Sequence, residues 1–307
     1  CSGLTSITIP NSVTGIRSTA FSHCESIVSM VVADANAVYD SRNGCNAIIE
    51  TATNTLVAGC QNTIIPNSVT KIGVQAFDCC YGLTSIAIPN SITSIGYSAF
   101  SYCSSLSSVT IPNSVTSIGS FAFGFCINLA SVFIPNSITN IESTTFYSCT
   151  SLTSITIPNS VTHIGHQAFL NCTSLTTIHV EATTPPALAD STVFMGTPAP
   201  VCVIPCGTLA AYEASDWAQY VSEFVEEGCA PIQQCGDNLF WEYADGVLTI
   251  TGTGDMYDYA ADTDVPWYDV RGNIKTVSLP DAMTKIGQNA FYKCTNMTTI
   301  NMPTSLT

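Results

Sequence analysis

Cysteine is the most abundant chemically reactive side chain here, with fifteen in 307 residues. Cysteines form disulfides, bind metals or act as nucleophiles. Seven of these, however, hold the same position of an element that repeats every 23 residues. Adjacent copies should then point in parallel, and we expect a column of small, buried, unpaired thiols. Its members are Cys80, Cys103, Cys126, Cys149 and Cys172, preceded by Cys1 and Cys24 at the same spacing.

A second group of cysteines, Cys202, Cys206, Cys229 and Cys235, allows three disulfide pairings. An extended segment would hold Cys202 and Cys206 too far apart to form a bridge with each other. Zinc is a rival interpretation, but neither pair has the two-residue spacing of a zinc knuckle and no histidine is near. The sequence favours a disulfide or plain burial and leaves the pairing open.

Other residues that could bind metals lack a supporting pattern. His163 and His166 replace variable residues of the repeat, which is typical of a surface. The acidic loop after residue 254 lacks the glycine and terminal glutamate of a helix-loop-helix calcium site, which favours a solvated loop over a calcium site. Its carboxylates are Asp255, Asp258, Asp262, Asp264 and Asp269. We expect no metal and no cofactor.

Catalysis finds little support in the residue pattern. An enzyme on a repetitive scaffold needs carboxylates or basic groups that converge on one groove. The regular repeats offer only Asp78 and Glu142, which occupy different positions in different repeats. There is no Ser-His-Asp set or phosphate-binding loop in a supporting context. The sequence predicts a protein that is not an enzyme, with a carbohydrate-active enzyme on a β-solenoid as the weakest alternative.

The repeat itself predicts the architecture. Each copy reads C-x-x-L-x-x-I-x-I-P-N-S-V-x-x-I-x-x-x-A-F, and a period of 23 residues is typical of a solenoid. In the copy that begins at Cys103, Leu106, Val109 and Ile111 fit a short strand that Pro112 ends, since proline cannot donate to a sheet. One repeat is too small to bury its own apolar side chains. Stacking of neighbouring copies must therefore form the core.

The strings LTSITIPNSVT (Leu4 to Thr14, and again Leu152 to Thr162) and IGSFAFGFC (Ile118 to Cys126) resemble the BspA-type leucine-rich repeat of bacterial surface proteins. The resemblance covers residues 1 to about 180 and resumes near Ile274. It implies a repeat solenoid of stacked short β-strands. The position after the second isoleucine of the motif is usually glycine, but Arg17 and Glu142 also occur there, so we expect no positive φ at it.

Two interruptions divide the chain. Residues 1–180 form a first array with a hairpin insertion near 34–60, where two apolar runs flank a Thr-Asn turn. A structural role for the hairpin is favoured, and a recognition element that stands out from the solenoid is the alternative. Counting 23 residues back from Leu83 predicts a buried thiol at Cys60.

The pattern stops at consecutive prolines after residue 180, and residues 181–230 are expected to be an α/β cap for the first array. Within it we expect a strand from Val201 to Ile204 and a helix from about Thr208, with Thr208 as N-cap. The apolar face of this helix would comprise Leu209, Tyr212, Trp217, Tyr220, Val221 and Phe224.

Residues 231–273 should form a β-rich linker or N-terminal cap with a hairpin turn at Asp245-Gly246. Residues 274–307 begin a second array. The chain starts and stops within a repeat, which suggests a segment of a longer protein.

Charge limits the possible partners. With 22 acidic against 7 basic residues, nucleic acid and anionic membranes are disfavoured. Most of the acids lie at or after Glu181, so the first array is nearly neutral. No stretch approaches the roughly 18 apolar residues that would cross a membrane.

The favoured function is a cell-surface or extracellular protein-binding or adhesion module, mostly because of the family resemblance. Host matrix or bacterial surface proteins, and also glycans, would be its partners. A spacer or scaffold that presents other domains is the alternative. The candidate ligand-binding residues lie in the outward column of the strand face, where Phe133 and His179 interrupt a series of small polar residues. They are Thr110, Phe133, Thr156 and His179.

Overall fold

The computed structural model describes residues 3–228, 233–261 and 263–306. It divides into two compact units, residues 1–228 and 229–307, here called the N-terminal and C-terminal units. This division groups the first array with its expected cap, and the β-rich segment with the second array. The finer boundaries inferred from the sequence stay predictions.

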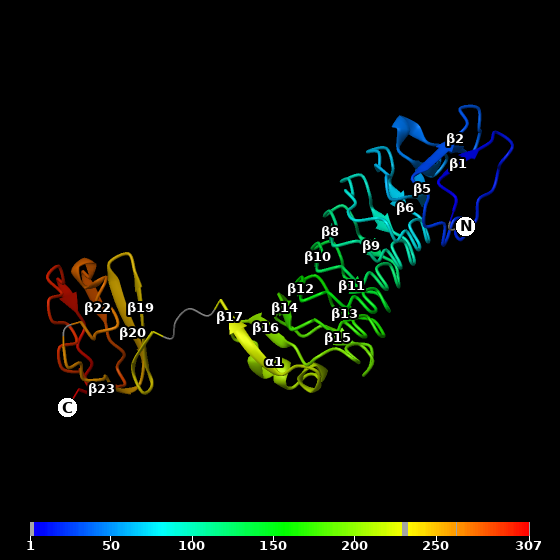
Figure 1. The fold of residues 1–307 in the computed structure, drawn as a ribbon. Coiled ribbons are helices and arrows are strands. Elements are labelled where there is room, and N and C mark those ends of the chain that lie inside the picture. The colour runs from blue at the N-terminus through cyan, green and yellow to red at the C-terminus, as the bar shows by residue number, and fades with distance from the viewer. Residues whose placement is uncertain (1–2, 229–232, 262, 307) are drawn as a thin grey trace. The chain divides into compact units, whose positions relative to one another are not determined.

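The N-terminal unit is a β-solenoid in which each repeat makes one turn (Figure 1). Short parallel strands stack along a first side of the solenoid, which we call the strand face. They belong to three ladders: β1 (Ser6–Ile9) with β2 (Ser29–Val32); β8 (Ser108–Thr110) with β10 (Ser131–Phe133); and β12 (Ser154–Ile157), β14 (Thr177–Val180), β16 (Val201–Pro205) and β17 (Glu223–Glu227). This confirms the stacked-strand solenoid that the repeat predicts.

A second side carries shorter strands, mostly of two residues. One ladder runs β3 (Tyr39–Asp40), β4 (Ala47–Glu50), β5 (Thr55–Gly59), β6 (Lys71–Ile72), β7 (Ser94–Ile95) and β9 (Ser117–Ile118), and another runs β11 (Asn140–Ile141), β13 (His163–Ile164) and β15 (Ala187–Leu188). The insertion forms the expected antiparallel hairpin, β4–β5. Because β5 pairs in parallel with β6, this hairpin begins the second-side ladder and does not stand out from the solenoid. Cys60, just after it, is buried as predicted.

Tight turns form the third side, and their phenylalanines stack through the interior. Phe77 and Phe100 have ring centroids 5.0 Å apart and planes 8° apart. Four further pairs continue the stack at 5.3 to 5.7 Å with planes within 10°. The stack comprises Phe77, Phe100, Phe123, Phe146, Phe169 and Phe194, each buried.

The cysteine column runs beside the phenylalanine stack. Four of its thiols donate to the carbonyl of the phenylalanine 26 residues earlier, for example Cys126 Sγ to Phe100 O at 3.1 Å. Cys103, Cys149 and Cys172 repeat this contact at 3.2 Å. All four are buried free thiols, as expected. Cys80 is a free thiol but only half-buried, Cys24 is also half-buried, and Cys1 lies outside the described residues.

The turns impose left-handed backbone on residues other than glycine. Gly96 and Gly119 have no positive φ, as predicted, but a Cβ on Gly119 would lie 2.5 Å from Tyr97 N, so glycine serves close packing between turns. Two residues later the backbone is left-handed in five repeats, and again just before six cysteines of the column. These positions are Gln75, Ser98, Phe121, Thr144 and Gln167, and His23, Cys79, Tyr102, Phe125, Ser148 and Asn171.

The cap continues the ladder and differs from the expected single helix. The strand from Val201 is confirmed, but α1 (Leu209–Glu213) is short and is followed by a 3-10 turn, Asp216–Gln219, and by β17. Thr208 Oγ1 donates to Pro205 O and does not cap the helix, and Leu209 is exposed. Phe224 lies on a strand because the alternating segment Glu223–Glu227 pairs with the otherwise open edge of β16.

Two aromatic side chains close the end of the core. Tyr212 Oη donates to Ala182 O at 2.7 Å, and Trp217 Nε1 donates to Pro186 O at 2.8 Å. Both are fully buried.

The C-terminal unit has its own core and sheet. Its main sheet is β18 (Gln234–Gly236), β19 (Leu239–Ala244), β20 (Val247–Gly252), β22 (Thr276–Ser278) and β24 (Thr299–Ile300), with β21 (Gly254–Asp255) paired to β23 (Met283–Lys285). The turn Asp245-Gly246 joins β19 to β20 with positive φ at both residues, which confirms the hairpin. Trp267 stacks on Phe291 at 5.8 Å.

Candidate functional site

The four candidate residues occupy the same outward slot of successive strands on the strand face. Phe133 of β10 lies opposite Thr110 of β8, and His179 of β14 lies opposite Thr156 of β12. No strand pairing joins β10 to β12. The structure therefore brings the four residues together as two pairs, each beside its own surface hollow.

The first hollow contains Phe133 and Thr110, and we call it the Phe133 hollow. Its volume is about 560 Å³, within the range typical of ligand sites. Phe133 is 54% exposed, which confirms that the strand register places it outward. The lining carries no charged side chain and consists of Ser85, Ile86, Ala87, Ile88, Asn90, Ser108, Thr110, Ile111, Pro112, Asn113 and Phe133.

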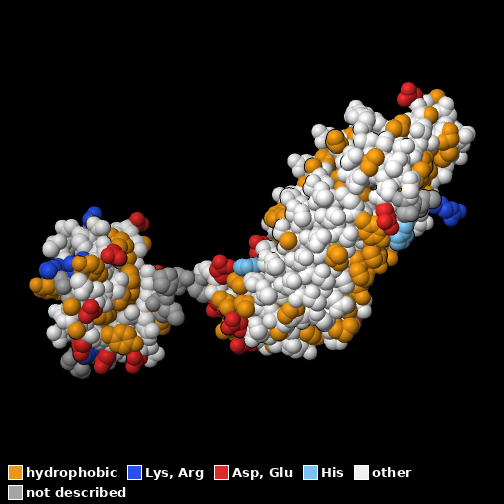
Figure 2. Space-filling model, viewed as in Figure 1, with side chains coloured by type: hydrophobic (Ala, Val, Ile, Leu, Met, Phe, Trp, Pro, Cys, Tyr) orange, Lys and Arg blue, Asp and Glu red, His pale blue; other side chains and the backbone are white. Residues whose placement is uncertain are grey.

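The second hollow lies where β14 meets the cap, and we call it the His179 hollow. Its volume is about 390 Å³, and Thr156, Glu181 and Glu227 lie around it with His179. His179 Nδ1 is 3.8 Å from Glu227 Oε2. In Figure 2, acidic side chains gather at this cap end of the N-terminal unit, whereas the middle of the solenoid shows few. The two hollows therefore differ in charge.

The turn side exposes a second set of aromatics. Tyr97 is 52% exposed, and Tyr102 and Phe125 stack at 4.5 Å with planes 8° apart. Phe125 also contacts Tyr147 at 5.1 Å. Phe125 thus contacts the rings of both Tyr102 and Tyr147, whereas no ring contact involves Phe133 among the described residues.

His163 lies on β13 and His166 lies in the turn that follows it, and both are exposed, as expected. His166 Nδ1 lies 2.7 Å from Asp190 Oδ2. Hydrogen bonds from the Thr192 hydroxyl, from His166 and from the Thr192 backbone lower the pKa of Asp190 to about 2. Within residues 3–228, 233–261 and 263–306, no cluster of three or more potential metal-binding side chains occurs.

Two carboxylates of the acidic loop in the C-terminal unit bind neighbouring side chains. Lys285 Nζ lies 2.6 Å from Asp258 Oδ2, and Thr284 Oγ1 donates to Asp255 Oδ1 at 2.6 Å. Asp262 lies outside the described residues. Among the cap cysteines, Cys206 is disulfide-bonded and Cys202 and Cys235 are buried free thiols. Cys229 lies outside the described residues.

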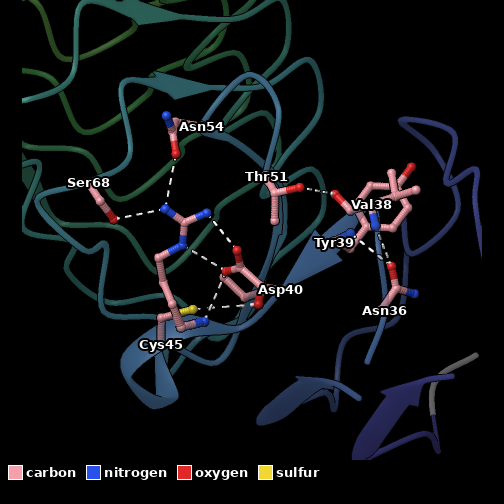
Figure 3. Close-up of polar contacts among 10 residues, drawn as sticks. Asn36, Val38, Tyr39, Asp40, Cys45, Thr51, Asn54 and Ser68 are labelled. Atoms are coloured by element: carbon pink, nitrogen blue, oxygen red, sulfur yellow. Dashed lines mark hydrogen bonds and ion pairs between the residues drawn. The ribbon is translucent and has the colours of Figure 1, made fainter. Parts of the chain in front are cut away.

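Two polar clusters escape the sequence pattern. Arg42 fixes the insertion: its guanidinium binds both carboxylate oxygens of Asp40, at 2.8 and 2.6 Å, and also Asn54 and Ser68 (Figure 3). Burial alone would raise the pKa of Asp40, but the hydrogen bonds and charge of Arg42 lower it overall. The local Asp-x-Arg sequence does not predict the contacts of Arg42 with Asn54 and Ser68, which lie far from it in the sequence.

The second cluster joins two repeats. Cys79 Sγ lies 3.5 Å from His23 Nε2, and Tyr81 Oη lies 3.4 Å from His23 Nδ1. A cysteine beside a histidine is the arrangement of a thiolate nucleophile. Burial, however, raises the pKa of Cys79, which favours the unreactive thiol.

Comparison with known proteins agrees with the repeat geometry. The sequence matches the family described as BspA type leucine rich repeat region (6 copies) over residues 1–57, 47–176 and 268–307, more than half of the chain. The chain belongs to this family. No curated protein matches it.

One solved structure of a bacterial leucine-rich repeat protein shares the fold of this BspA-type chain, and two others match it at TM-scores below 0.5. A leucine-rich repeat protein from Eubacterium ventriosum has a TM-score of 0.54 at 22% identity, over 63% of this chain and 59% of that one. The pneumococcal vaccine antigen PcpA has a TM-score of 0.48 at 16% identity, over 74% of this chain and 56% of that one. A leucine rich cell surface protein from Faecalibacterium prausnitzii has a TM-score of 0.39 at 24% identity, over 88% of this chain and 76% of that one. The chain thus spans less than two thirds of the length of the first two.

The BspA-type repeat fold supports a protein-interaction or scaffold role, and leucine-rich repeat proteins are generally not enzymes. In the part of the chain that the structure describes, no helix is long and apolar enough to cross a membrane.

Proposed function

We propose that the N-terminal unit is a protein-binding module that acts in adhesion at the cell surface, and that its strand face is the binding surface. Host matrix proteins or bacterial surface proteins are the partners, and no catalysis is involved. The observation that carries the proposal is Phe133, a large apolar side chain 54% exposed in an uncharged hollow.

The surroundings of Phe133 fit a contact residue. Aromatic side chains are enriched among residues that dominate binding energy, where they fill desolvated pockets. Thr110 beside it supplies a hydroxyl for hydrogen bonding. The hollow has no charged side chain that would lose its hydration when a partner binds. Thr156 and His179 extend the same face toward the acidic cap, where a polar rim would suit a partner's basic side chains.

The test compares Phe133→Glu with Tyr97→Glu, a matched control of nearly equal exposure on the turn side. Binding is measured to immobilised purified matrix proteins and to bacterial surface-protein extracts. Phe133→Glu should weaken binding by about 2 kcal/mol or more, about thirtyfold in Kd, without a change in melting temperature. Weakening by Tyr97→Glu alone would move the site to the turn-side aromatics and refute the proposal.

A spacer or scaffold role is the second candidate function. Two compact units, each with its own core and its own repeats, are suited to presenting other domains. This role predicts that neither Phe133→Glu nor Tyr97→Glu affects binding to any protein on the panel.

A further inference from the structure

The Phe133 hollow coincides with a break in the strand ladder. In several sister repeats, the residues before the Pro-Asn pair form strands such as β8 and β10, whereas residues 83–89, like residues 60–65 of the preceding repeat, form none. The side chains respond accordingly. Ile86 and Ile88 are only half-buried, although their counterparts one repeat later, Val109 and Ile111, are buried.

Three backbone N–H groups at the break have no partner among the described residues. The neighbouring repeats touch at one end of the break, where Ser107 N donates to Thr84 O at 3.3 Å. Beyond that point, no hydrogen bond from the backbone N–H of Ile86, Ala87 or Ile88 occurs among the described residues. Unpaired backbone donors beside apolar surface are the feature that lets an extended peptide add to a sheet.

A buried hydroxyl at the same place is also without a partner. In three sister repeats the serine after Pro-Asn donates to a carbonyl 22 residues earlier: Ser114 Oγ reaches Ile92 O at 2.7 Å, and Ser160 Oγ reaches Ile138 O at 2.7 Å. Ser137 makes the equivalent bond. In the repeat of the break, the Oγ atom of the half-buried Ser91 is itself buried and makes no such bond within the described residues. The stacking of this repeat is therefore incomplete.

We propose that the Phe133 hollow binds an uncharged, extended peptide segment of a partner protein by β-strand addition along residues 85–88. This inference rests on the proposed function and names the partner chemistry for the same site. The unpaired N–H groups that face the hollow bind the peptide backbone. Ile86 and Ile88, which occupy inward slots like those of Val109 and Ile111, contact the apolar side chains of the peptide. These alternate with outward side chains, one of which contacts Phe133, because successive side chains of a strand point to opposite faces. The uncharged lining selects against charged segments, whose burial without a counter-charge is costly.

The chain offers a matched pair of variants at Ala87, an exposed position whose N–H makes no bond within the described residues. Ala87→Pro removes this donor without breaking an intramolecular hydrogen bond, and proline favours an extended residue before it. Ala87→Ser keeps the N–H and is the control. Equal melting temperatures for the two variants would show that both are folded.

The probe is a display library of random uncharged decapeptides, selected on the 307-residue chain with Phe133→Glu protein as a counter-selection. The expected binders alternate apolar and polar residues. Their Kd should be unchanged by Ala87→Ser and raised about tenfold by Ala87→Pro, the effect of one hydrogen bond. Methylation of alternate backbone nitrogens in a selected peptide should weaken binding similarly, and this readout requires no change in the protein.

If neither Ala87→Pro nor N-methylation of the peptide changed the Kd of the selected binders, the β-strand addition would be overturned, but the strand face would remain the binding surface. Failure to select any binder would overturn the inference as well. A glycan array whose hits depend on Phe133 but not on the N–H of residue 87 would replace the peptide with a carbohydrate. The proposed function itself would be refuted only if Phe133→Glu weakened binding to no ligand at all, neither to the selected peptides nor to the proteins of the panel.

Discussion

The turn side and the strand face of the same solenoid differ in how freely their residues vary. In the interior of the turns, the stacked position is phenylalanine six times in succession, and each ring is buried between its neighbours. On the strand face, the outward slot holds Ala87, Thr110, Phe133, Thr156 and His179. A buried slot sees the same environment in every turn and requires the same shape, whereas an exposed slot imposes little. Specific recognition can therefore be encoded on the strand face without loss of the fold.

The largest expected effect breaks the interior stack. Phe123→Ala removes a ring that packs between Phe100 and Phe146, at 5.3 and 5.7 Å. We expect a loss of about 3–5 kcal/mol in the free energy of unfolding, because both neighbours lose contacts and a cavity remains. Urea unfolding measures it. A loss under about 1 kcal/mol would show that the stack adds little to stability.

Alkaline pH should destabilise the same interior. Burial raises the pKa of Cys126 and of Cys172 from near 9 to about 12. The unfolded chain then loses thiol protons above about pH 9 while the folded state keeps them, so stability is present below pH 9 and falls as pH rises toward 12. Chemical unfolding at pH 7 to 11 measures this decline, and Cys126→Ala, which loses one thiol, should reduce it. A flat profile would contradict the burial of the column.

The thiols themselves supply a sharper test of the interior. A thiol reagent at pH 8 should leave Cys103, Cys126, Cys149 and Cys172 unmodified in the native protein, because they are buried and un-ionised. In denaturant without reductant, all four should react. Mass spectrometry of peptides assigns each site. Modification in the native state, or a disulfide between neighbouring repeats, would refute the column.

A smaller effect concerns the left-handed turns. Thr144 is β-branched and has φ of 58°, a conformation that asparagine adopts at less cost. Thr144→Asn should raise the free energy of unfolding by about 0.5–1 kcal/mol, whereas Thr153→Asn, an exposed control before β12, should not. Thermal unfolding compares them, and equal midpoints would mean that the turn relaxes around threonine.

The smallest effect on stability is expected on the strand face. Phe133→Ser should change the free energy of unfolding by no more than about 0.5 kcal/mol, since over half of its side chain already contacts water. Urea unfolding beside Phe123→Ala makes the contrast direct. A loss comparable to that of Phe123→Ala would place Phe133 in the core and remove it from the candidate site.

The sequence by itself determined the period, the buried slots and the outward column, because a 23-residue repeat gives each position the same environment in every turn. It also determined the two hairpins, since Asp245-Gly246 and the Thr-Asn turn before β5 encode their geometry locally. The cap was only partly predictable: Phe224 fits a helix pattern, and only the open edge of β16 selects the strand.

Contacts between turns decided the rest. Phe133 and Thr110 line one hollow while Thr156 and His179 line another, although all four occupy one outward column, in which the strands β10 and β12 have no ladder pairing with each other. The half-buried Ile86 and the partnerless Ser91 are likewise invisible in a motif that reads the same in sister repeats. A local pattern specifies which side chains face outward, but the packing between neighbouring turns specifies where the strand face has a hollow.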